Sequence, residues 1–186
     1  MFNMIDYRSK FCSMYKNNEL NKSLLCQNIS NKPYCIIPMD KKCNKEYVES
    51  NNMTVIYSDH SGGALVLFPR DIAWTWFTDI AKMKPILEDI LAYLKEFDNE
   101  FYIDGNDIMY GENKVLGSMS IGEGLHYEGI FFSFNSDVEI IKNVTLKEVN
   151  KAPIGLAEFG IEPNHIIQMI EMLIDKYGLA EYNSKK

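Results

Sequence analysis

The most informative segment of the sequence runs from Tyr102 to Asn135 and reads YIDGNDIMYGENKVLGSMSIGEGLHYEGIFFSFN. Apolar and polar residues alternate over 107–110, a turn follows at 111–113, and a second strand pattern covers 114–120. A third apolar segment comes after two closely spaced glycines. The stretch therefore predicts a β-hairpin followed by a third strand.

The size and composition of the chain are those of one globular domain. With 186 residues, 46% of them hydrophobic and 24% charged, it can bury one substantial core and falls short of two. We expect a single domain over residues 1–186 with no C-terminal accessory domain. No apolar run approaches the roughly 18 residues of a membrane span, and Asp6, Arg8 and Lys10 interrupt any signal-peptide core. The sequence predicts a soluble, cytoplasmic protein with no membrane partner.

Charge and cysteine content limit the classes of partner. A net charge of −7 argues against nucleic acid, because binding phosphates draws on a basic face. The four cysteines, Cys12, Cys26, Cys35 and Cys43, match no zinc or redox spacing. We therefore expect reduced, partly buried thiols, with a metal site as the less favoured alternative.

The remaining elements extend outward from the hairpin. The expected strands are 34–38, 54–58, 64–68 and 72–77, and the expected helices are 41–51, 85–97 and 163–177. The two strands within 54–68 are expected to form a hairpin around a tight turn at 59–63, and 146–150 can form a helical turn. For the first 30 residues a helix and an edge strand are both open. Together these patterns predict an α+β fold in which helices pack on a mixed, mainly antiparallel sheet.

Three motifs within residues 102–135 resemble the core of the biotin and lipoate protein ligase superfamily. They are Asn-Asp-Ile at 106–108, Lys-Val-Leu-Gly-Ser at 114–118 and Gly-Ile-Phe-Phe-Ser-Phe-Asn at 129–135. The lipoate branch is the closer match, and the resemblance covers roughly residues 33–177. It implies the catalytic-domain fold of that superfamily.

The resemblance also implies a two-step reaction. Lipoate or octanoate would be activated by ATP, with Mg²⁺, to an acyl-adenylate. The acyl group would then pass to a lysine of a lipoyl-acceptor protein domain. Both steps build negative charge on phosphate or carbonyl oxygens, so a fixed cation and backbone donors are needed.

The resemblance assigns roles to ten residues. Lys114 is the expected catalytic cation, although a lysine leaving a turn can equally be an ordinary solvated side chain. The residues expected at the nucleotide and substrate are Ser61, Gly62, Gly63, Ala64, Asn106, Asp107, Gly117, Ser118 and Gly129. Asp107 is expected to hold Mg²⁺ or a lysine and Asn106 a phosphate or ribose, with an Asx turn as the alternative for both. The glycines let a ligand approach the backbone closely.

Departures from the family pattern keep other functions open. Asp59 and His60 stand where the family carries arginines, and Asp59 would repel a triphosphate. A catalytically degenerate relative that binds a small acyl ligand or a protein is therefore the main alternative. A biotin ligase is less favoured because its Gly-Arg-Gly-Arg loop is missing. The thioester chemistry of octanoyl transferases is excluded, since no cysteine follows Cys43.

Overall fold

The computed structural model describes residues 1–38, 43–58, 65–121, 126–145 and 151–182. Within these ranges the strands are β1 (Phe2–Asn3), β2 (Lys22–Gln27), β3 (Tyr34–Pro38), β4 (Thr54–Ser58), β5 (Leu65–Leu67), β6 (Ile72–Thr78), β7 (Phe101–Asp104), β8 (Asp107–Tyr110), β9 (Asn113–Ile121), β10 (His126–Phe132) and β11 (Ala180–Glu181). The helices are α1 (Tyr7–Lys16), α2 (Lys45–Ser50), α3 (Met83–Leu94), α4 (Val138–Thr145) and α5 (Pro163–Tyr177), with 3₁₀ turns η1 (Met4–Asp6) and η2 (Leu156–Phe159).

The larger sheet is mixed and mainly antiparallel. Its strands follow the order β1-β2-β6-β10-β9-β8-β7, and β11 also pairs with β2. Among the described strands of this sheet, only the short strands β1 and β11 pair in parallel, both with β2. The predicted hairpin is β8 and β9, and the predicted third strand is β10, so the fold class and the central stretch are confirmed.

A second, three-stranded sheet corrects one prediction. Its order is β4-β3-β5, so the strands at 54–58 and 64–68 do not form a hairpin. Strand β3 lies between them, parallel to β4 and antiparallel to β5. The physical reason is burial: β3 buries Ile36 on one face and Cys35 and Ile37 on the other, which suits a central strand. The predicted tight turn at 59–63 lies outside the described residues.

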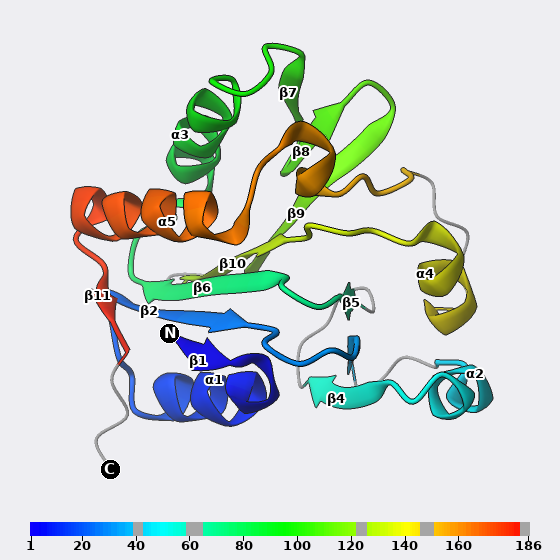
Figure 1. Cartoon of the computed structure of the whole chain (residues 1–186). Coiled ribbons are helices and arrows are strands. Elements are labelled where there is room, and N and C mark those ends of the chain that lie inside the picture. Colours follow the sequence, from blue (N-terminus) through cyan, green and yellow to red (C-terminus); the bar gives the residue numbers. More distant parts are fainter. Residues whose placement is uncertain (39–42, 59–64, 122–125, 146–150, 183–186) are drawn as a thin grey trace.

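One face of the larger sheet is covered by α3 and α5 (Figure 1). Alternate residues of β6 and β10 point to this side, among them Trp74, Trp76 and Phe132, all fully buried. The tryptophans share one face, as their spacing predicts, and they pack in the core. Helix α5 begins and ends at the residues expected from Pro163 and Gly178, the latter in the left-handed region with φ 61°.

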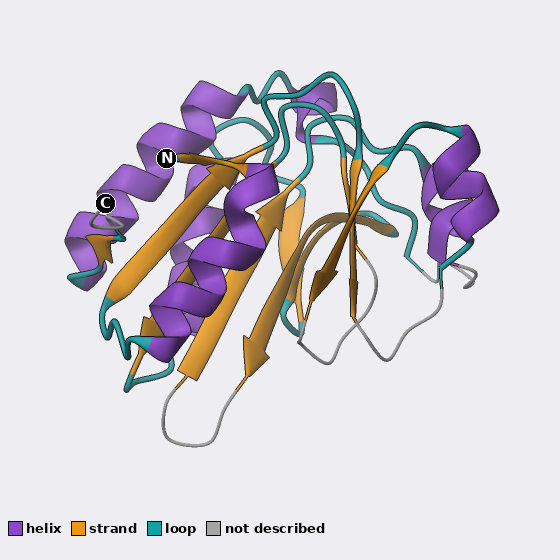
Figure 2. Ribbon diagram, turned by 90° about the horizontal axis from the view of Figure 1, so that it is seen from below, coloured by secondary structure: helices purple, strands orange, loops and turns teal. Residues whose placement is uncertain are grey.

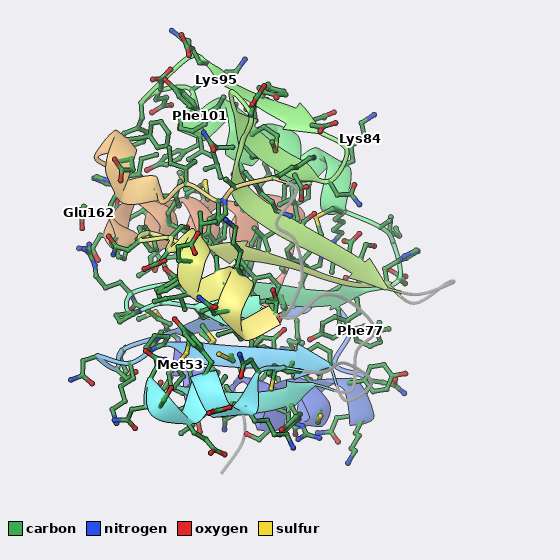
Figure 3. All side chains as sticks on the ribbon, turned by 90° about the vertical axis from the view of Figure 1, so that its right-hand side faces the viewer. Met53, Phe77, Lys84, Lys95, Phe101 and Glu162 are labelled. Atoms are coloured by element: carbon green, nitrogen blue, oxygen red, sulfur yellow. The ribbon has the colours of Figure 1, made fainter. Side chains whose placement is uncertain are left out.

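The opposite face is covered by α1 and the inner face of the small sheet (Figure 2). Phe11 of α1, Ile36 of β3 and Phe77 of β6 belong to this second apolar cluster. Figure 3 labels Phe77 and Phe101, which lie on the two sides of the larger sheet. Helices α2 and α4 cover the outer face of the small sheet. Helix α4 was not expected from the sequence, and the helical turn predicted at 146–150 lies outside the described residues.

Asp71 joins the two sheets through a buried carboxylate. Its oxygens accept hydrogen bonds from Phe68 N, Phe134 N and Ser133 Oγ, each at 2.8 Å. These bonds tie the end of β5 to the end of β10. Burial raises the pKa of the Asp71 carboxyl to about 7, and the three donors oppose that rise.

The raised pKa gives Asp71 a pH dependence of known sign. The unfolded carboxyl ionises near 3.8 and the folded one near 7, so the stability contributed by the protonated group declines as the pH rises between these values. We expect the free energy of unfolding of wild type, relative to that of Asp71→Asn, to decrease from about pH 4 to pH 7, because asparagine does not titrate. Urea denaturation at both pH values measures it. A difference that moves in favour of wild type over this range would contradict the assignment.

Candidate functional site

A β-bulge places Lys114, Gly117 and Asp107 on one face of the hairpin. The β8–β9 register pairs Ile108 with Leu116 but Met109 with Lys114, so Val115 is the extra residue. Lys114 and Gly117 are three residues apart, and in a regular strand their side chains would point to opposite faces. The bulge brings both to the side of Asp107, the cross-strand partner of Gly117. Val115 and Leu116 are both buried in the core on the other side.

The Lys114 ammonium is held over Gly117 by Asp107. Lys114 Nζ lies 2.7 Å from Asp107 Oδ1, with the two side chains 35% and 20% exposed. A Cβ atom built on Gly117 would lie 2.8 Å from Lys114 Cε and 3.0 Å from its Nζ. Any larger residue at 117 therefore displaces the ammonium. The absence of a side chain at residue 117 thus leaves room for the end of the Lys114 side chain.

A second lysine completes an ion network around Asp107. Lys151 Nζ lies 2.7 Å from Asp104 Oδ2 and 3.5 Å from Asp107 Oδ2. The hydrogen bond from Lys151 to Asp104 raises the pKa of the ammonium, which therefore stays charged at neutral pH. The ion network thus runs from Lys114 through Asp107 and Lys151 to Asp104. Sequence reasoning missed Lys151 and Asp104, because no local pattern connects residue 151 to this hairpin.

The backbone of Lys114 is fixed on both sides. On one side it belongs to the β8–β9 ladder. On the other it forms a parallel bridge with Pro153, in which Lys114 N donates to Ala152 O at 2.9 Å and Ile154 N donates to Lys114 O at 3.0 Å. The segment 152–154 thus extends the sheet beyond the end of β10. It also brings Lys151 to the site.

The other predicted residues divide between the two faces of the sheet. Gly129 pairs with Met119 and Thr75, on the same face as Asp107 and Gly117. Ser118 pairs with Ile130 and faces the opposite side, where its Oγ donates a hydrogen bond to the carbonyl oxygen of Asn106. This bond orders the turn before Asp107. The remaining predicted residues, Ser61, Gly62, Gly63 and Ala64, lie outside the described residues.

Glu128 carries a structural role that the sequence did not reveal. Its buried carboxylate accepts hydrogen bonds from Trp76 Nε1 at 2.8 Å, Lys82 N at 2.9 Å and Met83 N at 3.1 Å. The amides of Lys82 and Met83 lie at the start of α3 and have no acceptor within the helix, and a negative charge is favourable at this end of a helix. A lone acidic residue within an apolar strand was the available signal. Glu128 faces the helix side of the sheet, away from Lys114.

The carboxylates near Lys114 do not form a metal site by themselves. Asp107 directs one oxygen to each lysine, and Asp104 is bonded to Lys151. Within the described ranges no group of three or more His, Cys, Asp or Glu side chains is placed to hold a metal ion. Both oxygens of Asp107 face lysine ammonium groups in this structure, and the Mg²⁺ expected at Asp107 stays a prediction.

Two further observations concern the described part of the chain as a whole. A groove of about 560 Å³ runs between the η1–α1 segment and β4. It is lined by Ile5, Arg8, Ser9, Cys12, Thr54, Val55, Ile56 and Tyr57, none of which is a predicted site residue. No helix in the part of the chain that the structure describes has the length and apolarity to span a membrane.

Solved structures match this chain, whereas sequence comparisons do not. No protein-family model and no curated protein sequence matches the chain. Among solved structures, LipL1 of P. falciparum in complex with lipoate superposes with a TM-score of 0.71 at 18% identity. The alignment covers 96% of this chain and 60% of that one, so this chain spans less than two thirds of LipL1.

Two other solved structures give the same result. A structure of the bipartite lipoate protein ligase and its E2 lipoyl domain from Thermoplasma acidophilum matches with a TM-score of 0.68 at 12% identity, covering 96% of this chain and 82% of that one. Lipoate-protein ligase A bound with ATP matches with a TM-score of 0.66 at 13% identity, covering 88% and 76%. The resemblance read from the sequence is thereby confirmed for the fold: this chain has a divergent catalytic-domain fold of the lipoate protein ligase type.

Proposed function

We propose that this chain is a lipoate protein ligase-like enzyme, a single domain over residues 1–186. It would activate lipoate or octanoate with ATP and transfer the acyl group to a lysine of a lipoyl-acceptor domain. The observation that carries the proposal is the Lys114 ammonium, held over Gly117 by Asp107 on the hairpin of a lipoate ligase fold. A lysine at an ordinary solvated turn needs neither the bulge nor the glycine beneath it.

In the first step a carboxylate oxygen of the acid attacks the α-phosphorus of ATP. A new oxygen–phosphorus bond forms, the bond to the β-phosphate bridge oxygen breaks, and pyrophosphate leaves. Negative charge grows on the α-phosphoryl oxygens during this step. Lys114 supplies a positioned cation for that charge, and its fixed backbone limits the reorganisation that the step requires.

In the second step a neutral lysine amine of the acceptor domain attacks the carbonyl carbon of the acyl-adenylate. An amide bond forms, the bond to the phosphate oxygen breaks, AMP leaves, and the amine loses a proton. The same ammonium can donate to the carbonyl or phosphate oxygen of the mixed anhydride. One cation therefore serves both steps because both build charge at the same group.

Adenylation is the test of this proposal. Purified protein incubated with lipoate or octanoate, ATP and Mg²⁺ is expected to release pyrophosphate, which a coupled phosphate assay measures. Release should depend on the acid. Folded protein that releases no pyrophosphate with any medium-chain acid would favour the alternative, a non-catalytic relative that binds an acyl ligand or a protein. The specific observation behind that alternative is Asp59 and His60 in place of the family's arginines.

A Gly117→Ala substitution tests how Lys114 is positioned. The added methyl group would lie within 3.0 Å of the end of the Lys114 side chain, which must move. We expect the rate of adenylation to fall about tenfold, since a displaced cation loses its alignment with the phosphoryl oxygens. Gly111→Ala is the control at the hairpin turn, where the strain of a positive φ affects stability without touching Lys114. Equal rates for Gly117→Ala and wild type would show that the contact has no role.

A further inference from the structure

Asp107 is shared unequally between two lysines. Its Oδ1 lies 2.7 Å from Lys114 Nζ, whereas its Oδ2 lies 3.5 Å from Lys151 Nζ. Lys151 makes its shorter contact with Asp104 Oδ2, at 2.7 Å. The two ammonium groups balance the two carboxylates, and each lysine has one close partner. Asp107 thus has both ammonium groups within 3.5 Å, one at each of its oxygens.

Binding of an acyl-adenylate disturbs this balance at Lys114. When Lys114 turns to an oxygen of the ligand, its contact with Asp107 weakens, and the ligand adds a negative charge beside a carboxylate that is only 20% exposed. A partly buried carboxylate without a cation is unfavourable, and two nearby negative groups repel each other. Lys151 is the described cation already within reach of the free oxygen of Asp107.

We propose that Lys151 is a positioning residue of the acyl-adenylate site, which neutralises Asp107 while Lys114 engages the ligand. This inference rests on the proposed function. Asp104 weakens the contact between Lys151 and Asp107, because it competes with Asp107 for the same ammonium. Lys151 is held in place by the bridge between Pro153 and Lys114, so the two lysines are positioned by one piece of backbone.

The competition between Asp104 and Asp107 for Lys151 distinguishes neutralisation of Asp107 from a purely structural ion pair with Asp104. If Lys151 served only to brace the hairpin through Asp104, then Lys151→Met and Asp104→Asn would remove the same ion pair and weaken ligand binding equally. If Lys151 neutralises Asp107, the two variants act in opposite directions. Lys151→Met removes the cation, whereas Asp104→Asn releases it toward Asp107.

The experiment measures calorimetric binding of a lipoyl-adenylate analogue in which a sulfamoyl group replaces the phosphoryl linkage. In the full chain at low salt, Lys151→Met is expected to weaken binding about fivefold. Asp104→Asn should bind as tightly as wild type or more tightly, and Lys151→Arg should restore most of the affinity. The effect of Lys151→Met should shrink at about 1 M salt, where charge interactions are screened.

Lys142→Met is the control, because Lys142 forms an ion pair with Glu139 at 3.1 Å on the exposed surface of α4. It should bind like wild type. Equal affinity of wild type and Lys151→Met, or equal weakening by Lys151→Met and Asp104→Asn, would overturn the role of Lys151 alone. A wild-type protein that fails to bind the analogue would overturn the proposed function as well.

Discussion

Replacing Lys114 with methionine is expected to lower the rate of adenylation about 10²–10³-fold, as for the loss of one preorganised donor at a developing negative charge. Methionine keeps most of the length and the apolar stem that lies over Gly117, and it deletes only the charge. Asp107 keeps a cation near its second oxygen, because Lys151 lies 3.5 Å away. The hairpin should therefore fold normally, with a change in stability below about 1 kcal/mol.

Two measurements separate the catalytic role of Lys114 from that of a surface lysine. Pyrophosphate release gives the rate, and urea denaturation gives the stability of the same preparation. Lys142→Met serves again as the control and should leave both unchanged, since it removes an exposed ion pair on α4. If Lys114→Met were as active as wild type, Lys114 would be an ordinary turn residue and the resemblance would end at the fold.

Replacing Glu128 with alanine is expected to destabilise the protein by about 3 kcal/mol, because a buried donor left without an acceptor costs about 1–3 kcal/mol and Glu128 serves several donors. The substitution leaves Trp76 Nε1 and the first amides of α3 without their acceptor, and the bonds from Trp76 and Met83 are buried. It also removes the negative charge at the start of that helix. The loss is a large share of the 5–15 kcal/mol that typically separates folded and unfolded states.

Urea denaturation measures this loss as a lower midpoint with an unchanged slope. Glu128→Gln is the matched variant: it keeps one acceptor oxygen, which Trp76 and Lys82 can still share, and should lose about half as much. Because Glu128 faces away from Lys114, Glu128→Gln should retain adenylation at temperatures where it is folded. Wild-type stability in Glu128→Ala would mean that the bonds to α3 contribute little.

Local patterns predicted the parts of the fold whose information is local. Helix α5 follows from apolar spacing bounded by Pro163 and Gly178, and the β8–β9 hairpin follows from alternation around one turn. The order β4-β3-β5 could not be read in this way, because pairing between distant strands leaves no mark on either strand alone. Helix α4 did have a signal, the spacing of Ile140, Ile141 and Val144, which pack against the small sheet.

The candidate site was predictable in its types of residue and not in its geometry. The motif at 114–118 indicated Lys114 and Gly117 together, yet their shared face depends on a bulge at Val115. Val115 and Leu116 fit a regular strand equally well, so nothing in the sequence marks the extra residue. Lys151 reaches the site only through the bridge between Pro153 and Lys114. Such contacts arise from the folded chain as a whole.

The bridge at Pro153 also bears on aggregation through the edge of the sheet. In a parallel bridge with Lys114, the inward bonds belong to Ala152 and Ile154, so the backbone of residue 153 faces outward. A proline there has no N–H to offer to an incoming strand. The sheet is therefore extended past β10 by a segment that gives a further strand one donor fewer to pair with. Exposed strand edges are common starting points for aggregation, and in this chain the segment that brings Lys151 to the site also blunts such an edge.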